Sequence, residues 1–307
     1  MDALSDFHFH TDLSDGKHSI RDILAACMSA KANWGCKLKF LAPTDHNRIG
    51  DIEIAKLFEE HCGITYVPAI EVSASDYKKL HIGGYGIKNI NAMNEKYKRI
   101  SVNNEMKMLK MIERLRFEHG FDISNTFIEE ATRTSTLNRQ TIANEIQRLN
   151  RRTRDAYAEW VGPGGKVYEE TYKDTAANIV GHISDCGGIP VILHPKTIRH
   201  HYNPSTERHG VHINEQELDD LIKQLKSNVP SGRLGIECRP NSPKFSRFEL
   251  VRKKHKLFAI GGTDYHAEGF IGNSFVSQKE IDGIMRRINK TNDLFRETGK
   301  FYDTREI

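Results

Sequence analysis

The sequence predicts an α/β fold, a distorted (β/α)7 barrel that carries a helical insertion. Seven short apolar segments alternate with helical patterns, at 4–10, 38–44, 65–72, 80–87, 189–194, 234–239 and 257–263. Such alternation is typical of strands covered by helices. Six of the seven segments present a histidine, aspartate or glutamate near their ends, which is where barrel enzymes place their chemistry.

The first segment, "DFHFH" at residues 6–10, has the spacing of a strand with one chelating face. Side chains alternate along a strand, so His8 and His10 point to one side and Phe7 and Phe9 to the other. Imidazole is the commonest protein ligand for divalent transition metals. Two strand histidines that bond to neighbouring side chains are the alternative.

Helix signals separate the apolar segments. Ser19 and Asp22 form a capping pair before an apolar helical face, and Asn214 with Glu217 repeats the device. The segment from 174 to 187 has the same spacing and ends at a glycine, Gly187, which favours a helix C-terminus. We expect these amphipathic helices to cover a sheet.

The alternation stops between about 101 and 170, where no strand pattern occurs. A helix is predicted over 102–119, ended by Gly120, followed by short helices near 124–132, 139–149 and 153–160. We therefore divide the chain into a first barrel part (1–100), a helical insertion (101–170) and a second barrel part (171–307). An insertion that leaves the C-terminal ends of barrel strands lies over the active-site mouth.

Composition limits the possible partners and compartment. Of 307 residues, 45 are Lys or Arg and 41 are Asp or Glu, and a net charge of +4 does not predict binding to long duplex nucleic acid. The five cysteines show no CxxC spacing, which favours a reducing cytoplasmic location over a disulfide framework. We expect no signal peptide, because the segment with His8 and His10 begins almost at the first residue. We expect no membrane partner, because no apolar run approaches spanning length.

The ends of the segments, taken in order, resemble the motifs of one superfamily. They read "HFHTDLSDG", "PTDHN", "AIEVS", "LHIGGYG", "LHP" and "GTDYH". This ordered set is similar to the successive motifs of the PHP superfamily, the polymerase and histidinol phosphatase metal-dependent phosphoesterases. The resemblance implies a barrel of the PHP type and an enzyme that hydrolyses phosphoric esters, either a phosphatase or a phosphodiesterase.

The resemblance also implies a metal site of nine residues: His8, His10, Asp15, His46, Glu71, His81, His194, Asp264 and His266. One metal would take His8, His10, Glu71 and Asp264, a second Glu71, His81 and His194, and a third Asp15, His46 and His266. Two to three divalent transition metals are therefore expected. Mixed histidine and carboxylate ligands favour Mn, Fe or Zn (manganese, iron or zinc) over Mg or Ca. The expected catalytic residues are Asp264, Glu71 and His194.

Within the superfamily, one branch is most similar. The segments "LNRQTIANEI", "WVGPGGKVY" and "AANIVGHISDCGGIPVILHP" resemble the branch that contains 3′,5′-nucleotide phosphatases and ribonuclease AM. Arg139 matches the arginine of its "RPHIA" element, whereas Gln140 and Thr141 replace Pro and His. Arginine suits bidentate phosphate contacts. The candidate substrate-binding residues are Arg139, Lys196, Arg199 and His201. A surface ion pair is the alternative for Arg139, and a solvated loop for 199–201.

Two aspartates lie close to predicted ligands in the sequence. Asp6 and Asp45 either orient imidazole N–H groups or cap turns. Glu237 and Arg239, in the sixth segment, are predicted to line the pocket, with Cys238 between them in the core.

The expected function is hydrolysis of a phosphate ester of a nucleotide or short oligonucleotide through a metal-bound hydroxide. This corresponds to a 3′,5′-nucleoside bisphosphate phosphatase or a 5′-to-3′ exoribonuclease. Clustered divalent cations suit the chemistry because they clamp phosphate oxygens and lower the pKa of bound water. One alternative is a phosphatase of a small non-nucleotide ester such as histidinol phosphate. The other is a metal-loaded subunit without turnover, against which the complete ligand set speaks.

Overall fold

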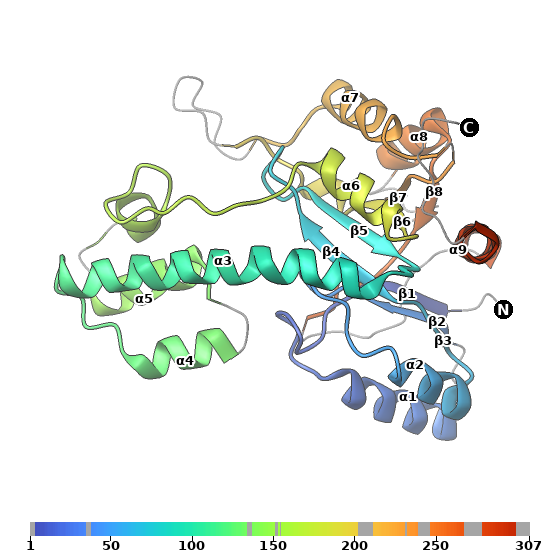
Figure 1. Cartoon of the computed structure of the whole chain (residues 1–307), viewed down its shortest axis with the longest axis horizontal. Coiled ribbons are helices and arrows are strands. Elements are labelled where there is room, and N and C mark those ends of the chain that lie inside the picture. The colour runs from blue at the N-terminus through green and yellow to red at the C-terminus, as the bar shows by residue number, and fades with distance from the viewer. Residues whose placement is uncertain are drawn as a thin grey trace.

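The computed structural model describes residues 4–34, 38–133, 137–150, 153, 155–201, 211–230, 232–238, 246–266 and 278–298. The strands in these ranges form two sheets (Figure 1). The first sheet has three parallel strands in the order β1 (Leu4–Phe9), β2 (Leu38–Pro43) and β3 (Thr65–Tyr66). The second has five, in the order β4 (Ala69–Ser73), β5 (His81–Tyr85), β6 (Ile189–Leu193), β7 (Gly235–Glu237) and β8 (Phe258–Ile260).

The two sheets meet at their edges without a continuous ladder. Isolated parallel bridges join Phe9, at the end of β1, to Tyr265, and His46, beyond β2, to Glu71 in β4. The predicted mixed α/β class is therefore confirmed. A closed (β/α)7 barrel is not found among the described strands, which divide into a three-stranded and a five-stranded sheet.

The segment 65–72, predicted as one strand, is two strands in different sheets. β3 pairs with β2, whereas β4 pairs with β5. Val67 and Pro68 lie between them, and proline has no N–H to donate to a ladder. The prediction of a single strand was wrong because it treated the apolar residues on both sides of Pro68 as one continuous segment. The break moves the chain from one sheet to the other and places Glu71 beside the residues that follow β2.

β5 is antiparallel to both of its neighbours, β4 and β6. His81 is thus the first residue of its strand. Other predicted ligands on this edge include Glu71 in β4 and residues that follow β1, β2 and β6. Because β5 is reversed, its beginning lies at the edge where parallel strands end. His81 reaches the same edge as the other predicted ligands, by a different route from the one predicted.

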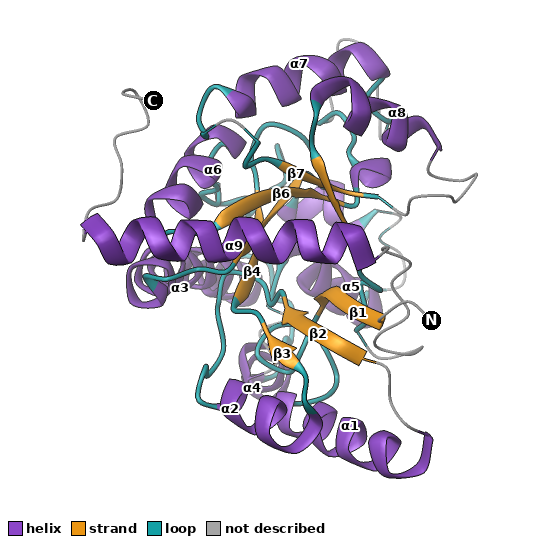
Figure 2. Cartoon of the chain, turned by 90° about the vertical axis from the view of Figure 1, so that its right-hand side faces the viewer, coloured by secondary structure: helices purple, strands orange, loops and turns teal. Residues whose placement is uncertain are grey.

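Helices cover the outer faces of the sheets (Figure 2). They are α1 (Ile20–Trp34), α2 (Ile54–Leu57), α6 (Ala176–Asp185), α7 (Glu215–Lys226), α8 (Ser246–His255) and α9 (Gln278–Thr298). Ile281, Ile284 and Ile288 of α9 belong to one buried cluster with residues of both sheets, including Phe7 and Val191. Helix α9 therefore packs across the line where the sheets meet.

The predicted helix boundaries at three capping residues are confirmed. Ser19 and Asp22 bond reciprocally before α1, with Ser19 N donating to Asp22 Oδ2 at 2.9 Å. Asn214 and Glu217 form a capping box at α7. After α6, Gly187 adopts a left-handed φ of 75°, which suits a residue without a Cβ.

The residues between 101 and 170 contain α4 (Asn125–Arg133), α5 (Arg139–Leu149) and most of α3 (Ile90–Phe117). The helix predicted from 102 in fact begins at Ile90, where the side chain of Asn89 accepts a hydrogen bond from Ala92 N. Its first half packs in the core against the sheets through Met93 and Tyr97. Its second half belongs to a separate cluster whose members lie between 108 and 167.

None of the helices in the described part of the chain has both the length and the apolar character that a membrane span requires.

Candidate metal centre

The alternation predicted for the first strand is confirmed by the contacts of its side chains, since both of its faces are buried. Phe7 and Phe9 are fully buried and pack in apolar clusters on the face of β1 opposite to the histidines. His8 and His10 are also buried, but their rings face other imidazoles and carboxylates. The strand thus fixes two imidazoles rigidly at the edge where the sheets meet.

Glu71 is at the centre of the cluster, on β4, and is 1% exposed. Its Oε2 lies 3.4 Å from His8 Nε2, 3.0 Å from His10 Nε2 and 3.7 Å from His46 Nδ1. Its Oε1 lies 2.6 Å from His81 Nδ1 and 3.0 Å from His194 Nε2. One buried carboxylate therefore faces five imidazoles, which come from different strands and loops.

Two aspartates and a further histidine form the open side of the cluster. Asp264 Oδ1 lies 3.4 Å from Nε2 of both His8 and His10. Asp15 Oδ2 lies 3.6 Å from His46 Nε2 and 3.5 Å from His266 Nε2. Asp15, Asp264 and His266 are each 38–45% exposed, so this side of the cluster is accessible to a solute.

The donor set fits divalent transition metals. Four groups of three residues bring ligating atoms within 4.8 Å of one another, and together they include eight of the nine predicted ligands: His8, His10, Asp15, His46, Glu71, His194, Asp264 and His266. The ninth, His81, contacts Glu71 directly. Nε2 of His8 and of His10 is buried and makes no aligned hydrogen bond with a described residue. Buried polar atoms normally have a partner, and a metal ion would supply one.

The electrostatics of the cluster also favour a cation. Burial alone would lower the pKa of His10, but the carboxylates of Asp264 and Glu71 outweigh it and raise this pKa to about 9. Burial would raise the pKa of Asp15, but His266, His46 and His10 outweigh it and lower this pKa to about 2. The carboxylates are therefore ionised and create a negative potential that attracts positive charge. For His46, burial lowers the pKa to about 4, so this imidazole stays neutral, the form that binds metals.

Backbone strain is concentrated at the same place. His194, Asp264 and Asn47, which follows His46, have φ values of 26°, 54° and 57°. Non-glycine residues rarely adopt positive φ, and each instance costs of order 1–3 kcal/mol. Such strain persists where the surroundings hold the backbone, and it accumulates at functional sites.

Asp6 and Asp45 hold the loops that carry the ligands. Asp45 accepts hydrogen bonds from Thr11 N, Thr11 Oγ1 and Ser14 Oγ, each at 2.7 Å. Asp6 accepts from Thr263 N at 3.0 Å and Thr263 Oγ1 at 2.7 Å. Of the two roles left open by the sequence, these contacts are those of turn caps.

Two supporting contacts were not predicted. Thr197 Oγ1 lies 2.7 Å from His194 Nδ1, and Ser14 Oγ lies 3.4 Å from His10 Nδ1. The only available signal was spacing, because each hydroxyl residue lies three or four positions after its histidine. Glu237, predicted to line the pocket, contacts His8 Nδ1 at 3.3 Å. Arg239 lies outside the described residues.

The candidate substrate-binding residues contact other parts of the chain. Arg139, in the first turn of α5, donates to Glu169 O and Thr171 Oγ1, both at 2.9 Å, and its guanidinium lies 4.7 Å from the centre of the Tyr168 ring. Arg199 pairs through its backbone with Lys78, and His201 Nε2 lies 2.7 Å from Ser75 O. Lys196 is exposed in the turn after His194. For Arg139, the surface ion pair that the sequence left as the alternative is not seen among the described residues, where its hydrogen bonds and ring contact are with neutral groups.

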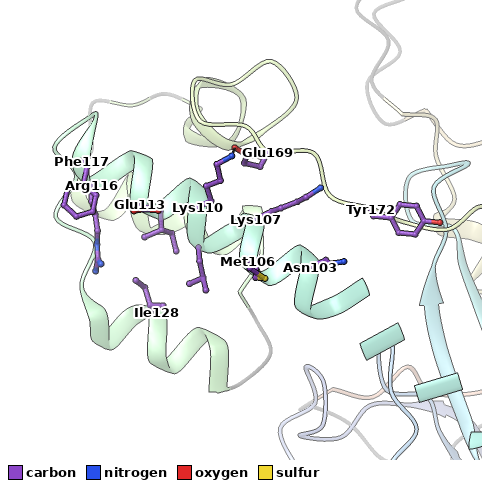
Figure 3. A pocket seen from close by; sticks show the side chains of 12 residues that line it. Asn103, Met106, Lys107, Lys110, Glu113, Arg116, Phe117, Ile128, Glu169 and Tyr172 are labelled. Carbon is purple, nitrogen blue, oxygen red and sulfur yellow. Dashed lines mark ion pairs between the residues drawn. The ribbon is translucent and has the colours of Figure 1, made fainter. Parts of the chain in front are cut away.

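A hollow of about 770 Å³ lies elsewhere, on the second half of α3 (Figure 3). It is lined by residues of α3, by Ile128 of α4 and by Glu169 and Tyr172 of the segment that follows α5. None of its lining residues is among the nine predicted ligands. The clustered imidazoles, with their charge and strain, are therefore the stronger candidate for chemistry.

Comparison with known proteins identifies the class of enzyme. The chain is 25% identical over 295 residues to the 3′,5′-nucleoside bisphosphate phosphatase of Chromobacterium violaceum, covering 92% of this chain and 94% of that protein. It is 24% identical over 276 residues to the phosphoribosyl 1,2-cyclic phosphate 1,2-diphosphodiesterase of Eggerthella lenta, covering 86% and 95%. No protein-family model matches the chain. The relatives confirm the predicted class, a phosphoric ester hydrolase.

Solved structures share the fold. An amidohydrolase from Chromobacterium violaceum with bound sulfate and no metal has a TM-score of 0.66 at 24% identity, covering 94% of this chain and 97% of that one. A proposed metal-dependent phosphoesterase from Bifidobacterium adolescentis has a TM-score of 0.63 at 22% identity, covering 92% and 96%. With the two relatives, these similarities confirm the resemblance to PHP-type phosphoesterases.

Proposed function

We propose that the chain hydrolyses a phosphate ester of a nucleotide or short oligonucleotide at the cluster around Glu71, with bound divalent metals. The observation that carries this proposal is the position of Glu71, whose two oxygens face five imidazoles. Glu71 would hold divalent cations together with the imidazoles around it, and the cations would supply Lewis-acid chemistry. No purely structural role requires so many ionisable groups at one partly open edge.

Following the family resemblance, we assign the residues to three groups that could each hold one metal. Glu71, His8, His10 and Asp264 form the first, Glu71, His81 and His194 the second, and Asp15, His46 and His266 the third. When bound, the metals supply Lewis-acid stabilisation of phosphate oxygens and activation of water. Mixed imidazole and carboxylate ligands favour Mn, Fe or Zn.

The protein side chains contribute position and charge. Glu71 and Asp264 place negative charge beside the imidazoles, which would help to hold cations at this edge of the sheets. The exposed side, formed by Asp15, Asp264 and His266, leaves a path for the ester. His194 and Asp264 lie at strained backbone positions, so their side chains are held in place before substrate arrives.

A nucleotide substrate is supported by the name of one relative, a 3′,5′-nucleoside bisphosphate phosphatase. The name of the other relative specifies a cyclic phosphodiester, which also contains a ribosyl phosphate. Arg139, Lys196, Arg199 and His201 are proposed to bind the part of such a substrate that is not cleaved. A small non-nucleotide ester and a non-catalytic, metal-loaded subunit remain the competing functions.

Phosphate release across a set of esters tests the proposal. Metal-loaded protein is incubated with a 3′,5′-nucleoside bisphosphate, short RNA oligonucleotides, a ribosyl cyclic phosphate and histidinol phosphate. We expect kcat/KM at least about tenfold higher for a nucleotide or oligonucleotide than for histidinol phosphate, because one added charge-assisted contact contributes about 1.5 kcal/mol or more. The reverse order would favour the small-ester function. Hydrolysis of none of them by metal-loaded protein would favour the non-catalytic subunit.

Replacing Arg139 with alanine separates its two possible roles. If its guanidinium binds a phosphate that is not cleaved, kcat/KM for a 3′,5′-bisphosphate should fall roughly tenfold to a hundredfold, mainly through KM. Turnover of p-nitrophenyl phosphate, which has no second phosphate, should hardly change. Steady-state kinetics on both substrates measure the difference.

Arg148 provides a matched control, because it lies in the last turn of the same helix and pairs with Glu145 at 2.7 Å. Arg148→Ala should leave both activities unchanged. If Arg139→Ala only lowers the melting temperature and spares both activities, the residue serves to fasten the 169–171 segment to α5.

A further inference from the structure

Glu237, the last residue of β7, contacts two predicted metal ligands through a single oxygen. Its Oε2 lies 3.3 Å from Nδ1 of His8 and accepts a hydrogen bond from the backbone N of His194 at 2.6 Å. The side chain of Glu237 is 12% exposed, and that of His8 is fully buried. A largely enclosed carboxylate with two N–H partners is held firmly in one position.

The contact with His8 determines which ring nitrogen carries the proton. An ionised carboxylate only accepts hydrogen bonds, so Nδ1 of His8 must be the donor. In the neutral ring, the lone pair is then on Nε2. That atom lies 3.4 Å from Glu71 Oε2 and 3.4 Å from Asp264 Oδ1, and it makes no aligned hydrogen bond with a described residue. Glu237 thereby directs the lone pair of His8 into the cluster.

The contact with His194 acts on the backbone. His194 has a φ of 26°, and its ring is held separately, with Nδ1 2.7 Å from Thr197 Oγ1. Its Nε2 lies 3.0 Å from Glu71 Oε1. The hydrogen bond from its backbone N to Glu237 stabilises the strained turn. Glu237 thus positions the backbone of His194, and Thr197 sets the rotation of its ring.

We infer that Glu237 is a positioning residue that couples two metal positions, a role that rests on the metal centre of the proposed function. One position depends on His8 and the other on His194, and both residues depend on the same oxygen. The third group, Asp15, His46 and His266, has no contact with Glu237 among the interactions described above. Removing Glu237 should therefore weaken two metal positions together and leave the third unchanged.

Zinc titration of the metal-free protein, followed by competition with a chromogenic chelator, tests this coupling. For Glu237→Ala we expect two of the binding events to weaken, each by roughly 10- to 100-fold, as for the loss of other groups that support metal-bound histidines. Thr197→Val should weaken only one event. Glu237→Gln retains an oxygen acceptor and should lie between the wild type and Glu237→Ala.

Asp219 provides the matched control, because its Oδ1 lies 2.7 Å from His255 Nε2 in a buried pair outside the cluster. Asp219→Asn should not alter any zinc affinity. Wild-type zinc affinities in both Glu237 variants, or equal weakening of all three events, would overturn the positioning role. Circular dichroism verifies that each variant folds. If Glu237→Ala does not fold, Glu237→Gln still tests the inference.

The titration contains no phosphate ester, so it is separate from the test of activity. A wild-type protein that binds zinc as expected but hydrolyses no ester would refute the proposed activity and leave the role of Glu237 intact. Unchanged zinc binding in the Glu237 variants of an active enzyme would refute the coupling alone.

Discussion

Glu71→Gln should lower kcat by about 100- to 1,000-fold or more while the chain stays folded. The substitution keeps the volume of the side chain but removes the one negative charge that faces five imidazoles. Cations held by the cluster would then repel one another with less compensation, since only Asp15 and Asp264 would remain among the predicted carboxylate ligands. Loss of a preorganised charge at a reacting centre costs rate on this scale. Steady-state phosphate release, with metal content measured on the same sample, gives the result.

Glu145→Gln is the control for this substitution. Glu145 is also buried, at 7% exposure, but it lies on α5 and pairs with Arg148. Its loss should leave kcat unchanged. If Glu71→Gln retains wild-type turnover at equal metal content, the reaction takes place elsewhere in the protein.

Removal of metal by a chelator should reduce hydrolysis to the background rate, and adding Mn²⁺, Fe²⁺ or Zn²⁺ should restore it. The reason is that the described groups of the cluster are imidazoles and carboxylates directed at one another, an arrangement suited to holding cations that activate water. Elemental analysis before and after treatment, paired with activity, makes the measurement quantitative.

The same treatment should lower the melting temperature, because a ligand that binds only the folded state stabilises it. Without cations, ionised carboxylates and imidazoles are packed together with unfavourable desolvation. Mg²⁺ at equal concentration should restore activity less well, since it prefers an all-oxygen shell. Full activity in protein shown to contain no Mn, Fe or Zn would refute the metal dependence.

Local signals in the sequence predicted much of this arrangement. Alternation in "DFHFH" predicted the faces of His8 and Phe7, and capping pairs predicted where α1 and α7 begin. These features depend on neighbouring residues, so they can be inferred from a single chain. The nine proposed ligands came from the ends of apolar segments together with a family resemblance, and the structure brings them together.

Features that depend on distant residues were not predicted. The break at Pro68 is visible in the sequence, but the fact that it divides two sheets depends on which strands pair. The reversal of β5 likewise follows from its neighbours β4 and β6 and not from its own residues. Thr197 could be assigned to His194 only after the strained turn that joins them was known.

The long helix α3 has a mechanical consequence. It contains 28 residues and spans about 42 Å at 1.5 Å per residue, with neither proline nor glycine to bend it. One half is embedded in the core against the sheets and the other in the cluster between 108 and 167 (Figure 1). The helix can therefore act as a rigid lever. A rotation of about 5° at its N-terminal end would displace its C-terminal end by about 4 Å. Helices α4 and α5, which share the cluster between 108 and 167 with the second half of α3, would move with it.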